Sequence, residues 1–124
     1  MHTSSKKLRE FEELVRAQGC CVTGAGYGVQ IHHVLGRKGR YNKQDIGGIY
    51  ILPLHESVHV VTGTHPNAWH KNKNGFIHEF GHPRDLFEGV LTELIEDHDL
   101  YGDDEMLKFI SAEQITAIME CPYV

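Results

Sequence analysis

Apolar residues at helical spacing predict a helix near the start of the chain. It runs from Ser4 to Gln18, where a serine can cap the first turn and Gly19 can end the helix. Its apolar stripe consists of Leu8, Phe11, Leu14 and Val15. The remaining positions are mostly charged, so we expect an amphipathic helix with one face on a core.

Helical spacing returns in the second half of the sequence. Residues Asn72–Phe80 predict a short helix that ends at Gly81, and Pro83 then opens a longer amphipathic helix. Ser111 and Gln114 fit a capping box ahead of a last helix. The second half is therefore expected to be helical.

Between these helices, short β-prone pieces alternate with glycine, a pattern typical of strands and tight turns. Cys21–Thr23 and Val29–Ile31 predict a β-hairpin, with His32 and His33 on or just after its second strand. Neighbouring strand residues point to opposite faces, so these two histidines can serve different roles.

A second apolar run, Ile49–Leu52, predicts a short buried strand. Pro53 follows it, and because proline suits the first turn of a helix, we predict a helix from Pro53 to Val61. A basic, glycine-punctuated loop, Gly36–Lys43, lies between the histidine pair and this strand. The predicted order is strand, loop, strand, helix.

These elements predict an α+β fold in a single domain over residues 1–124. The strands and the helix after them would form a core over about residues 20–62, preceded by one helix and followed by a helical tail over about residues 72–124. A chain of 124 residues with 40% hydrophobic side chains is long enough to bury an ordinary core.

Location and redox state follow from what the sequence lacks. No apolar run is long enough to span a bilayer and the first residues do not resemble a signal peptide, so we expect a cytoplasmic protein without a membrane partner, in the host cytoplasm if a phage encodes it. Three cysteines are an odd number, and two of them, Cys20 and Cys21, are adjacent, which argues against a disulfide scaffold.

The net charge of −5 conceals an uneven distribution along the chain. Residues 1–84 carry eleven Lys or Arg and six acids, whereas residues 85–124 carry one Lys and eleven acids. The first part could approach a polyanion such as DNA, and its basic loop offers Arg37, Lys38, Arg40 and Lys43 to a phosphate backbone. Two solvated faces of opposite sign are the alternative explanation.

The chain has ten histidines, and most of them lie between residues 32 and 82. His55 and His59 are four residues apart, a spacing that puts two imidazoles on one face of a helix. The sequence therefore predicts a metal site built from histidine.

The order of these motifs resembles the HNH, or His-Me finger, endonucleases. The resemblance covers about Cys20 to Val61: a hairpin with a His-His pair, a loop, and a helix with further ligands. It implies a ββα-metal core in which His32 binds the ion and His33 activates the water that attacks the phosphate. His59 and His55 would complete the site, with His65 and His70 as second choices.

Within this superfamily, the chain is most similar to the phage recombination enhancement nucleases, the Ref family that acts with RecA. Ile31-His32-His33, Ile51-Leu52-Pro53-Leu54 and the segment from Phe76 to Leu86 follow the order of elements there. The likeness implies DNA cleavage and a RecA filament as a partner. It implies one divalent ion, Zn²⁺ as the bound species with Mg²⁺ or Mn²⁺ possible in turnover, and leaves open a structural zinc at Cys20 and Cys21.

Two other functions fit parts of the sequence. His55-Glu56-Ser57-Val58-His59 is an HExxH motif, which would make Glu56 the base of a zinc metalloprotease. However, Thr62 stands where a metzincin has glycine, and this hypothesis gives no role to His32 and His33. A non-catalytic, zinc-stabilised DNA-binding module would use the basic loop but not His33.

Overall fold

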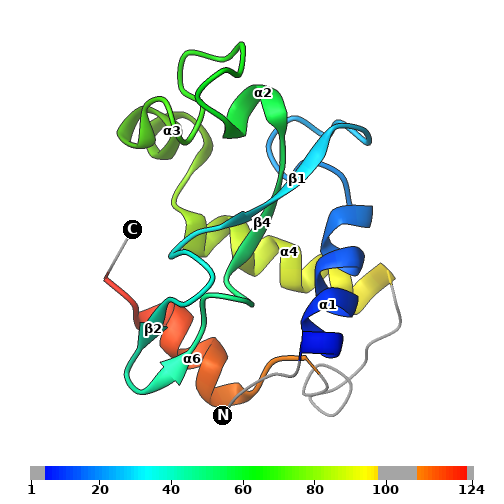
Figure 1. Cartoon of the computed structure of the whole chain (residues 1–124), viewed down its shortest axis with the longest axis vertical. Helices are drawn as coiled ribbons and strands as arrows, with labels where there is room; N and C mark the ends of the chain where they lie inside the picture. The colour runs from blue at the N-terminus through cyan, green and yellow to red at the C-terminus, as the bar shows by residue number, and fades with distance from the viewer. Residues whose placement is uncertain (1–4, 98–108, 123–124) are drawn as a thin grey trace.

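The computed structural model describes residues 5–97 and 109–122 and has a mixed α and β fold (Figure 1). Its elements are α1 (Ser5–Ala17), β1 (Val29–His33), β2 (Arg40–Tyr41), β3 (Gln44–Asp45), β4 (Ile51–His55), α2 (Glu56–His59), α3 (Lys73–Phe80), α4 (Pro83–Asp97) and α6 (Ala112–Glu120). Among the described residues, no helix has the length and apolarity needed to cross a membrane.

The central sheet pairs β1 with β4 in antiparallel orientation, from Val29 opposite His55 to His33 opposite Ile51. The predicted hairpin was therefore wrong in its partner, because Cys21–Thr23 forms a turn. That turn still contacts the sheet, since the backbone N–H of Cys21 donates to the carbonyl of Pro53 at 2.9 Å.

Pro53 lies inside β4, opposite Ile31, and does not open a helix. The N–H and C=O positions of one residue in an antiparallel strand point to the same side. Because the Pro53 carbonyl bonds to Cys21, outside the ladder, its nitrogen also faces away from β1. The missing N–H thus breaks no bond between the two strands.

The helix predicted over Pro53–Val61 is a single turn, α2, that begins only at Glu56. His55 is its N-cap, with extended backbone angles of φ −64° and ψ 147°. The His55 Nδ1 accepts a hydrogen bond from the backbone N–H of Ser57 at 3.1 Å. This side chain therefore ends β4 and starts the helix turn.

A small hairpin, β2–β3, begins within the basic loop, where the sequence predicted irregular structure. Its turn residues Asn42 and Lys43 have positive φ angles of 50° and 65°, which match the twist of a tight two-residue turn. Arg40 Nε lies 3.0 Å from Asp45 Oδ1 across the hairpin.

The four longer helices among the described residues, α1, α3, α4 and α6, confirm the predictions from periodicity. Asn72 caps α3 through a hydrogen bond from the Gly75 backbone N–H at 3.0 Å. Ser111 and Gln114 form both bonds of the predicted capping box at the start of α6.

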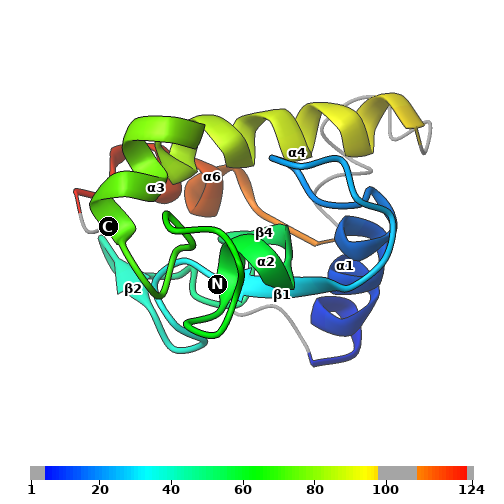
Figure 2. The same ribbon diagram turned by 90° about the horizontal axis from the view of Figure 1, so that it is seen from above.

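The buried residues of the helices form one core with those of β4. Figure 2 shows α4 running along one side of the β1–β4 pair, with α1 at one end. Aromatic packing connects the sheet to α4: the ring of Tyr50, just before β4, lies 5.4 Å from that of Phe87, centroid to centroid. The largest side chains with almost no exposure are Tyr50, Phe11, Phe76, Phe87, Ile46, Ile49, Ile51, Leu52, Leu54, Leu94, Ile110 and Ile118.

Candidate metal centre

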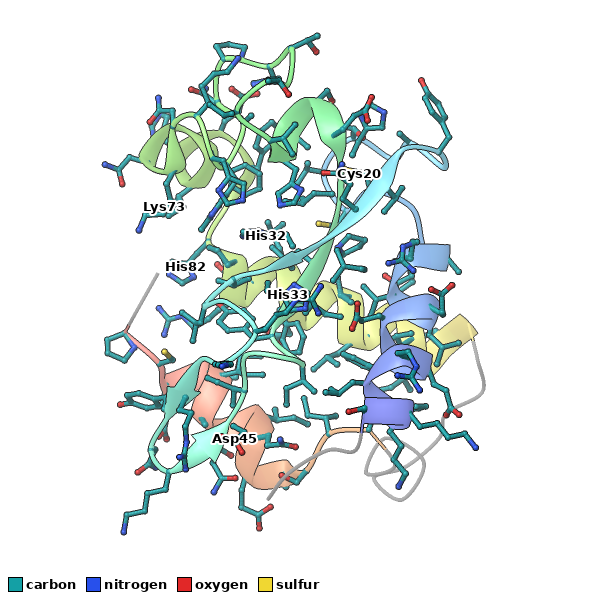
Figure 3. The ribbon with its side chains drawn as sticks, viewed as in Figure 1. Cys20, His32, His33, Asp45, Lys73 and His82 are labelled. Carbon is teal, nitrogen blue, oxygen red and sulfur yellow. The ribbon has the colours of Figure 1, made fainter. Side chains whose placement is uncertain are left out.

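Three histidines from separate segments converge beside the central sheet. His32 lies on β1, His59 is the last residue of α2, and His70 lies between α2 and α3. One ring nitrogen from each lies within 4.8 Å of the others, close enough to hold a metal ion. Figure 3 marks His32 on its strand beneath the segment that carries the other two.

Backbone hydrogen bonds bring His70 to this position. The segment after α2 folds back along it, with the Trp69 N–H donating to the Val58 carbonyl at 2.8 Å and the His70 N–H to the His59 carbonyl at 3.0 Å. The Trp69 ring then packs 4.7 Å from the His32 ring, centroid to centroid. His32 is consequently only 3% exposed.

The environment keeps two of these imidazoles neutral. Burial lowers the pKa of His32 to about 3, and the nearby His59, His70 and His33 add to the shift. Burial, followed by His70 and His33, lowers the pKa of His59 to about 4. Both rings are therefore uncharged at neutral pH, the form that ligates metal.

Gln30 determines which nitrogen of His59 faces the cluster. The Gln30 Oε1 lies 2.7 Å from His59 Nδ1, and a carbonyl oxygen only accepts, so His59 Nδ1 carries the proton. The lone pair of His59 Nε2 then points at His32 Nδ1, 3.2 Å away. A side-chain carbonyl that orients a ligating imidazole in this way is common around metals.

These features fit a divalent transition-metal ion. Imidazole nitrogens suit Zn²⁺ and related ions, and three protein ligands leave a coordination position for water or substrate. His32 Nδ1 and His59 Nε2 face each other 3.2 Å apart. A cation bound to both nitrogens would replace this weak contact between the two rings.

His33 lies next to the cluster but on the other face of β1, and it is half-buried. Burial lowers its pKa, as does the charge of Arg37, while Glu12 acts in the opposite direction. A half-buried, neutral imidazole therefore lies one residue from His32 of the cluster.

The structure does not bring His55 into the cluster. Sequence spacing put His55 and His59 on one helical face, but His55 precedes the helix and its Nδ1 is bonded to Ser57. Its ring packs edge-on against Tyr27, with ring centroids 5.3 Å apart. The cluster therefore contains His70, which the sequence ranked second, in place of His55.

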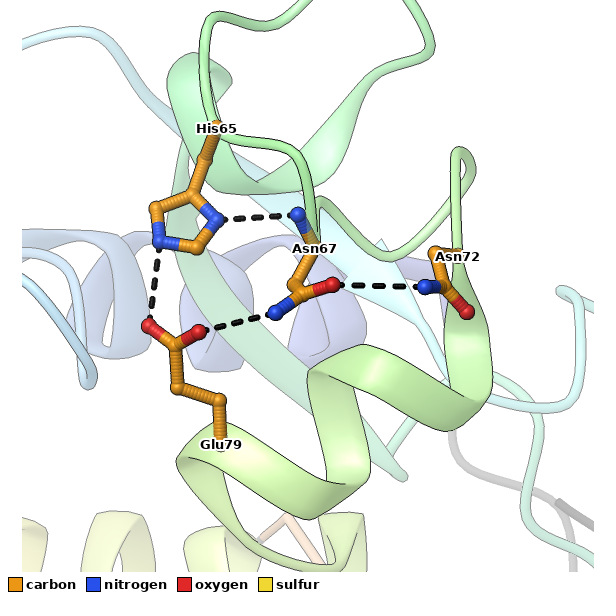
Figure 4. A network of polar contacts seen from close by, with 4 residues as sticks. All are labelled: His65, Asn67, Asn72 and Glu79. Carbon is orange, nitrogen blue, oxygen red and sulfur yellow. Dashed lines mark hydrogen bonds and ion pairs between the residues drawn. The ribbon is translucent and has the colours of Figure 1, made fainter.

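His65, the other second choice, belongs to a separate polar network (Figure 4). Its Nδ1 accepts from the Asn67 backbone N–H at 3.0 Å, and its Nε2 lies 3.0 Å from Glu79 Oε2 on α3. The Asn67 amide donates to the other Glu79 oxygen at 2.8 Å and accepts from Asn72. Both ring nitrogens of His65 are therefore already in use, and the network ties the loop to α3.

The cysteines take no part in a metal-binding group among residues 5–97 and 109–122. Cys20 is buried, and its sulfur accepts from the Thr23 backbone N–H at 3.4 Å. Burial raises the pKa of Cys21 to about 12, so it is a neutral thiol.

The predicted DNA-contacting residues of the basic loop are exposed: Arg37, Lys38, Arg40 and Lys43.

Sequence reasoning missed the two residues that support the cluster, Gln30 and Trp69. Gln30 lies two positions before His32 on the same strand, so alternation along β1 puts both side chains on one face. That spacing could have identified it. No local pattern indicates that Trp69 packs on His32.

No protein-family model, curated protein or solved structure matches the chain.

Proposed function

We propose that this protein is a metal-dependent endonuclease that hydrolyses DNA phosphodiester bonds. The observation that carries the proposal is the convergence of His32, His59 and His70 with His33 one residue away. Two antiparallel strands followed directly by a helix turn, β1, β4 and α2, support a ββα-metal core of the His-Me finger type.

In the proposed site, His32, His59 and His70 hold one divalent ion. When bound, the ion would offset negative charge on the phosphate and on the leaving oxygen. The imidazole-rich donor set favours Zn²⁺ as the bound species, with Mg²⁺ or Mn²⁺ in turnover.

His33 acts as the general base. A neutral ring nitrogen of His33 takes a proton from water as the water oxygen forms a bond to phosphorus. The bond between phosphorus and the leaving sugar oxygen breaks, and that oxygen takes a proton from solvent. The positions of His32 and His33 on opposite faces of β1 separate ligand from base.

The exposed basic loop supports contact with the DNA backbone. Arg37, Lys38 and Lys43 are solvent-exposed, whereas Arg40 also pairs with Asp45. Contacts of this kind are sensitive to salt and largely indifferent to sequence. A RecA filament is a further proposed partner, from the family resemblance alone.

The geometry gives less support to a metalloprotease. That function needs both histidines of HExxH on one ion, but His55 caps α2 and lies outside the group that contains His59. A non-catalytic zinc-stabilised DNA-binding module has the same ligands as the nuclease and differs only in turnover.

Plasmid nicking tests the proposal. The purified protein is incubated with supercoiled DNA and Mg²⁺, Mn²⁺ or Zn²⁺, alongside His33→Ala and Glu56→Ala. Nicking by wild type and Glu56→Ala, with a loss of at least about a hundredfold in His33→Ala, is the expected result. Salt-sensitive DNA binding without nicking would favour the binding module, and casein cleavage that depends on Glu56 would favour the protease.

A further inference from the structure

A cavity of about 270 Å³ lies beside the basic loop, away from the three clustered histidines. Segments far apart in sequence form it: α1, the loop before β2, the β2–β3 hairpin, the segment before β4, and α6. None of the four histidines of the proposed site lines it.

The wall and the rim of this cavity differ in chemistry. Leu8 and the fully buried Ile49 form an apolar wall, with Gly48 beside them. Arg37 and Lys38 stand exposed at the rim. The acid on this rim, Asp45, pairs with Arg40, so the unbalanced charge there is positive.

The loop around the cavity is held by close backbone packing. A Cβ on Gly47 would lie 2.2 Å from the carbonyl oxygen of Gly36 and 2.3 Å from the nitrogen of Gly39. The Gln114 amide of α6 donates to the Asp45 carbonyl at 2.8 Å and so anchors the hairpin. The cavity is thus part of the folded structure and needs no rearrangement to form.

We propose that this cavity takes one nucleobase of the bound strand, with the neighbouring phosphate held by Arg37 and Lys38. The inference rests on the proposed function and deepens it. A flat, mostly apolar ring joined to an anionic group matches an apolar wall with a cationic rim. Ligand pockets range upward from about 300 Å³, so a cavity of this size suits a single ring system.

The proposed nuclease site and the cavity lie along one stretch of chain. The Gly36 N–H donates to the His33 carbonyl at 3.1 Å, and Arg37 follows directly. In Figure 3, His33 lies between His32 and Asp45, a cavity-lining residue. A strand that passes His33 toward the loop would therefore present a nearby base to the cavity.

The base would be bound by burial more than by hydrogen bonds to its edge. Gln114 is the lining residue with a side-chain amide, and its Oε1 already accepts from the Ser111 N–H at 2.9 Å while its Nε2 bonds to Asp45. We therefore expect weak discrimination between bases.

Calorimetric titration of the metal-free full chain with thymidine 5′-monophosphate tests the cavity without any cleavage. Thymidine and inorganic phosphate are titrated separately. Because both halves of the nucleotide are engaged, it should bind at least about tenfold more tightly than either part. Equal affinity for phosphate and nucleotide, or no saturable binding, would overturn the proposal.

Three variants locate the binding. Arg37→Glu should weaken nucleotide binding by about tenfold or more, and Leu8→Ala should weaken it by about threefold. Arg9→Glu makes the same charge change at a residue of α1 that does not line the cavity, and should stay within about twofold. An equal loss of nucleotide affinity in Arg9→Glu and Arg37→Glu would contradict the assignment of the cavity as the binding site. If Leu8→Ala does not fold, the comparison of Arg37→Glu with Arg9→Glu still tests the proposal.

The two proposals can fail separately. Plasmid nicking by a protein that does not bind the nucleotide would reject the cavity and leave the nuclease. Saturable nucleotide binding that is sensitive to Arg37→Glu, in a protein that never nicks DNA, would reject the nuclease and leave the nucleotide site.

Discussion

Gln30 Oε1 lies 2.7 Å from His59 Nδ1, although 29 positions separate the two residues in the sequence. The contact links β1 to α2 and leaves the unprotonated Nε2 of His59 facing His32. A residue that touches neither a bound ion nor DNA in the proposed site therefore orients one of its ligands.

Replacing Gln30 should weaken metal binding without removing a ligand. In Gln30→Leu the His59 ring loses its acceptor, and we expect Zn²⁺ affinity to fall by about tenfold. Gln30→Glu keeps an acceptor at the same place and should bind Zn²⁺ at least as tightly as wild type. Competition with a chromogenic chelator measures both, and equal affinity in all three proteins would show that the contact has no role.

The structure and the spacing in the sequence indicate different third ligands, His70 and His55 respectively. His70→Ala should reduce Zn²⁺ affinity by at least about tenfold, because it removes one of three donors. His55→Asn keeps an acceptor for the Ser57 N–H and should leave affinity within about threefold. The reverse order of effects would restore the spacing-based ligand set of His55 and His59.

Gly47 and Gly48 provide a matched test of the packing below the basic loop. A Cβ at Gly47 would meet backbone atoms at 2.2 Å, whereas one at Gly48 would meet only the end of the Leu8 side chain, at 3.2 Å. Gly47→Ala should lower the free energy of unfolding by about 2–3 kcal/mol, and Gly48→Ala should cost less than about 1 kcal/mol. Urea denaturation followed by circular dichroism gives both values, and similar losses would contradict the packing described.

Protonation of His82 should make the metal-free protein less stable in acid. Burial, and then the charge of Arg84, lowers the pKa of His82 below its ordinary 6.5, while Asp85 opposes the shift. The unfolded chain then binds the proton more readily, so this stability is present above pH 6.5 and is lost as the pH falls through the folded pKa.

His82→Asn isolates this contribution. Asparagine can still accept from the Arg84 N–H, which the His82 Nδ1 does at 3.1 Å, but it does not titrate. Melting curves between pH 7 and pH 5 in a chelator should fall less steeply for the variant. Parallel curves would show that His82 does not contribute.

The helices were predictable because their signals are local. The stripe of α1, the Asn72 cap of α3 and the capping box of α6 depend on residues within a few positions of each other. Pairing of β1 with β4 depends on residues about twenty positions apart, and no local pattern distinguishes β4 from the nearer Cys21–Thr23 as the partner.

The candidate site was predicted in part for the same reason. His32 and His59, two of the predicted ligands, lie in one cluster, whereas the place of His55 depended on where α2 begins. Helix α2 begins at Glu56, three residues later than the predicted start at Pro53, so His55 caps the helix and does not share a helical face with His59. His70 reaches the cluster through backbone bonds between a loop and α2, which no periodicity describes.

Pro53 has a consequence for self-association. A sheet of two strands leaves the outer side of each open to a strand from another molecule, the usual start of aggregation. At the centre of β4, that side offers no N–H because residue 53 is proline, and its carbonyl is already taken by Cys21. The strand that precedes the proposed ligand helix is therefore blocked at its middle against edge-to-edge pairing, so the protein can keep a minimal sheet without recruiting a neighbour to extend it.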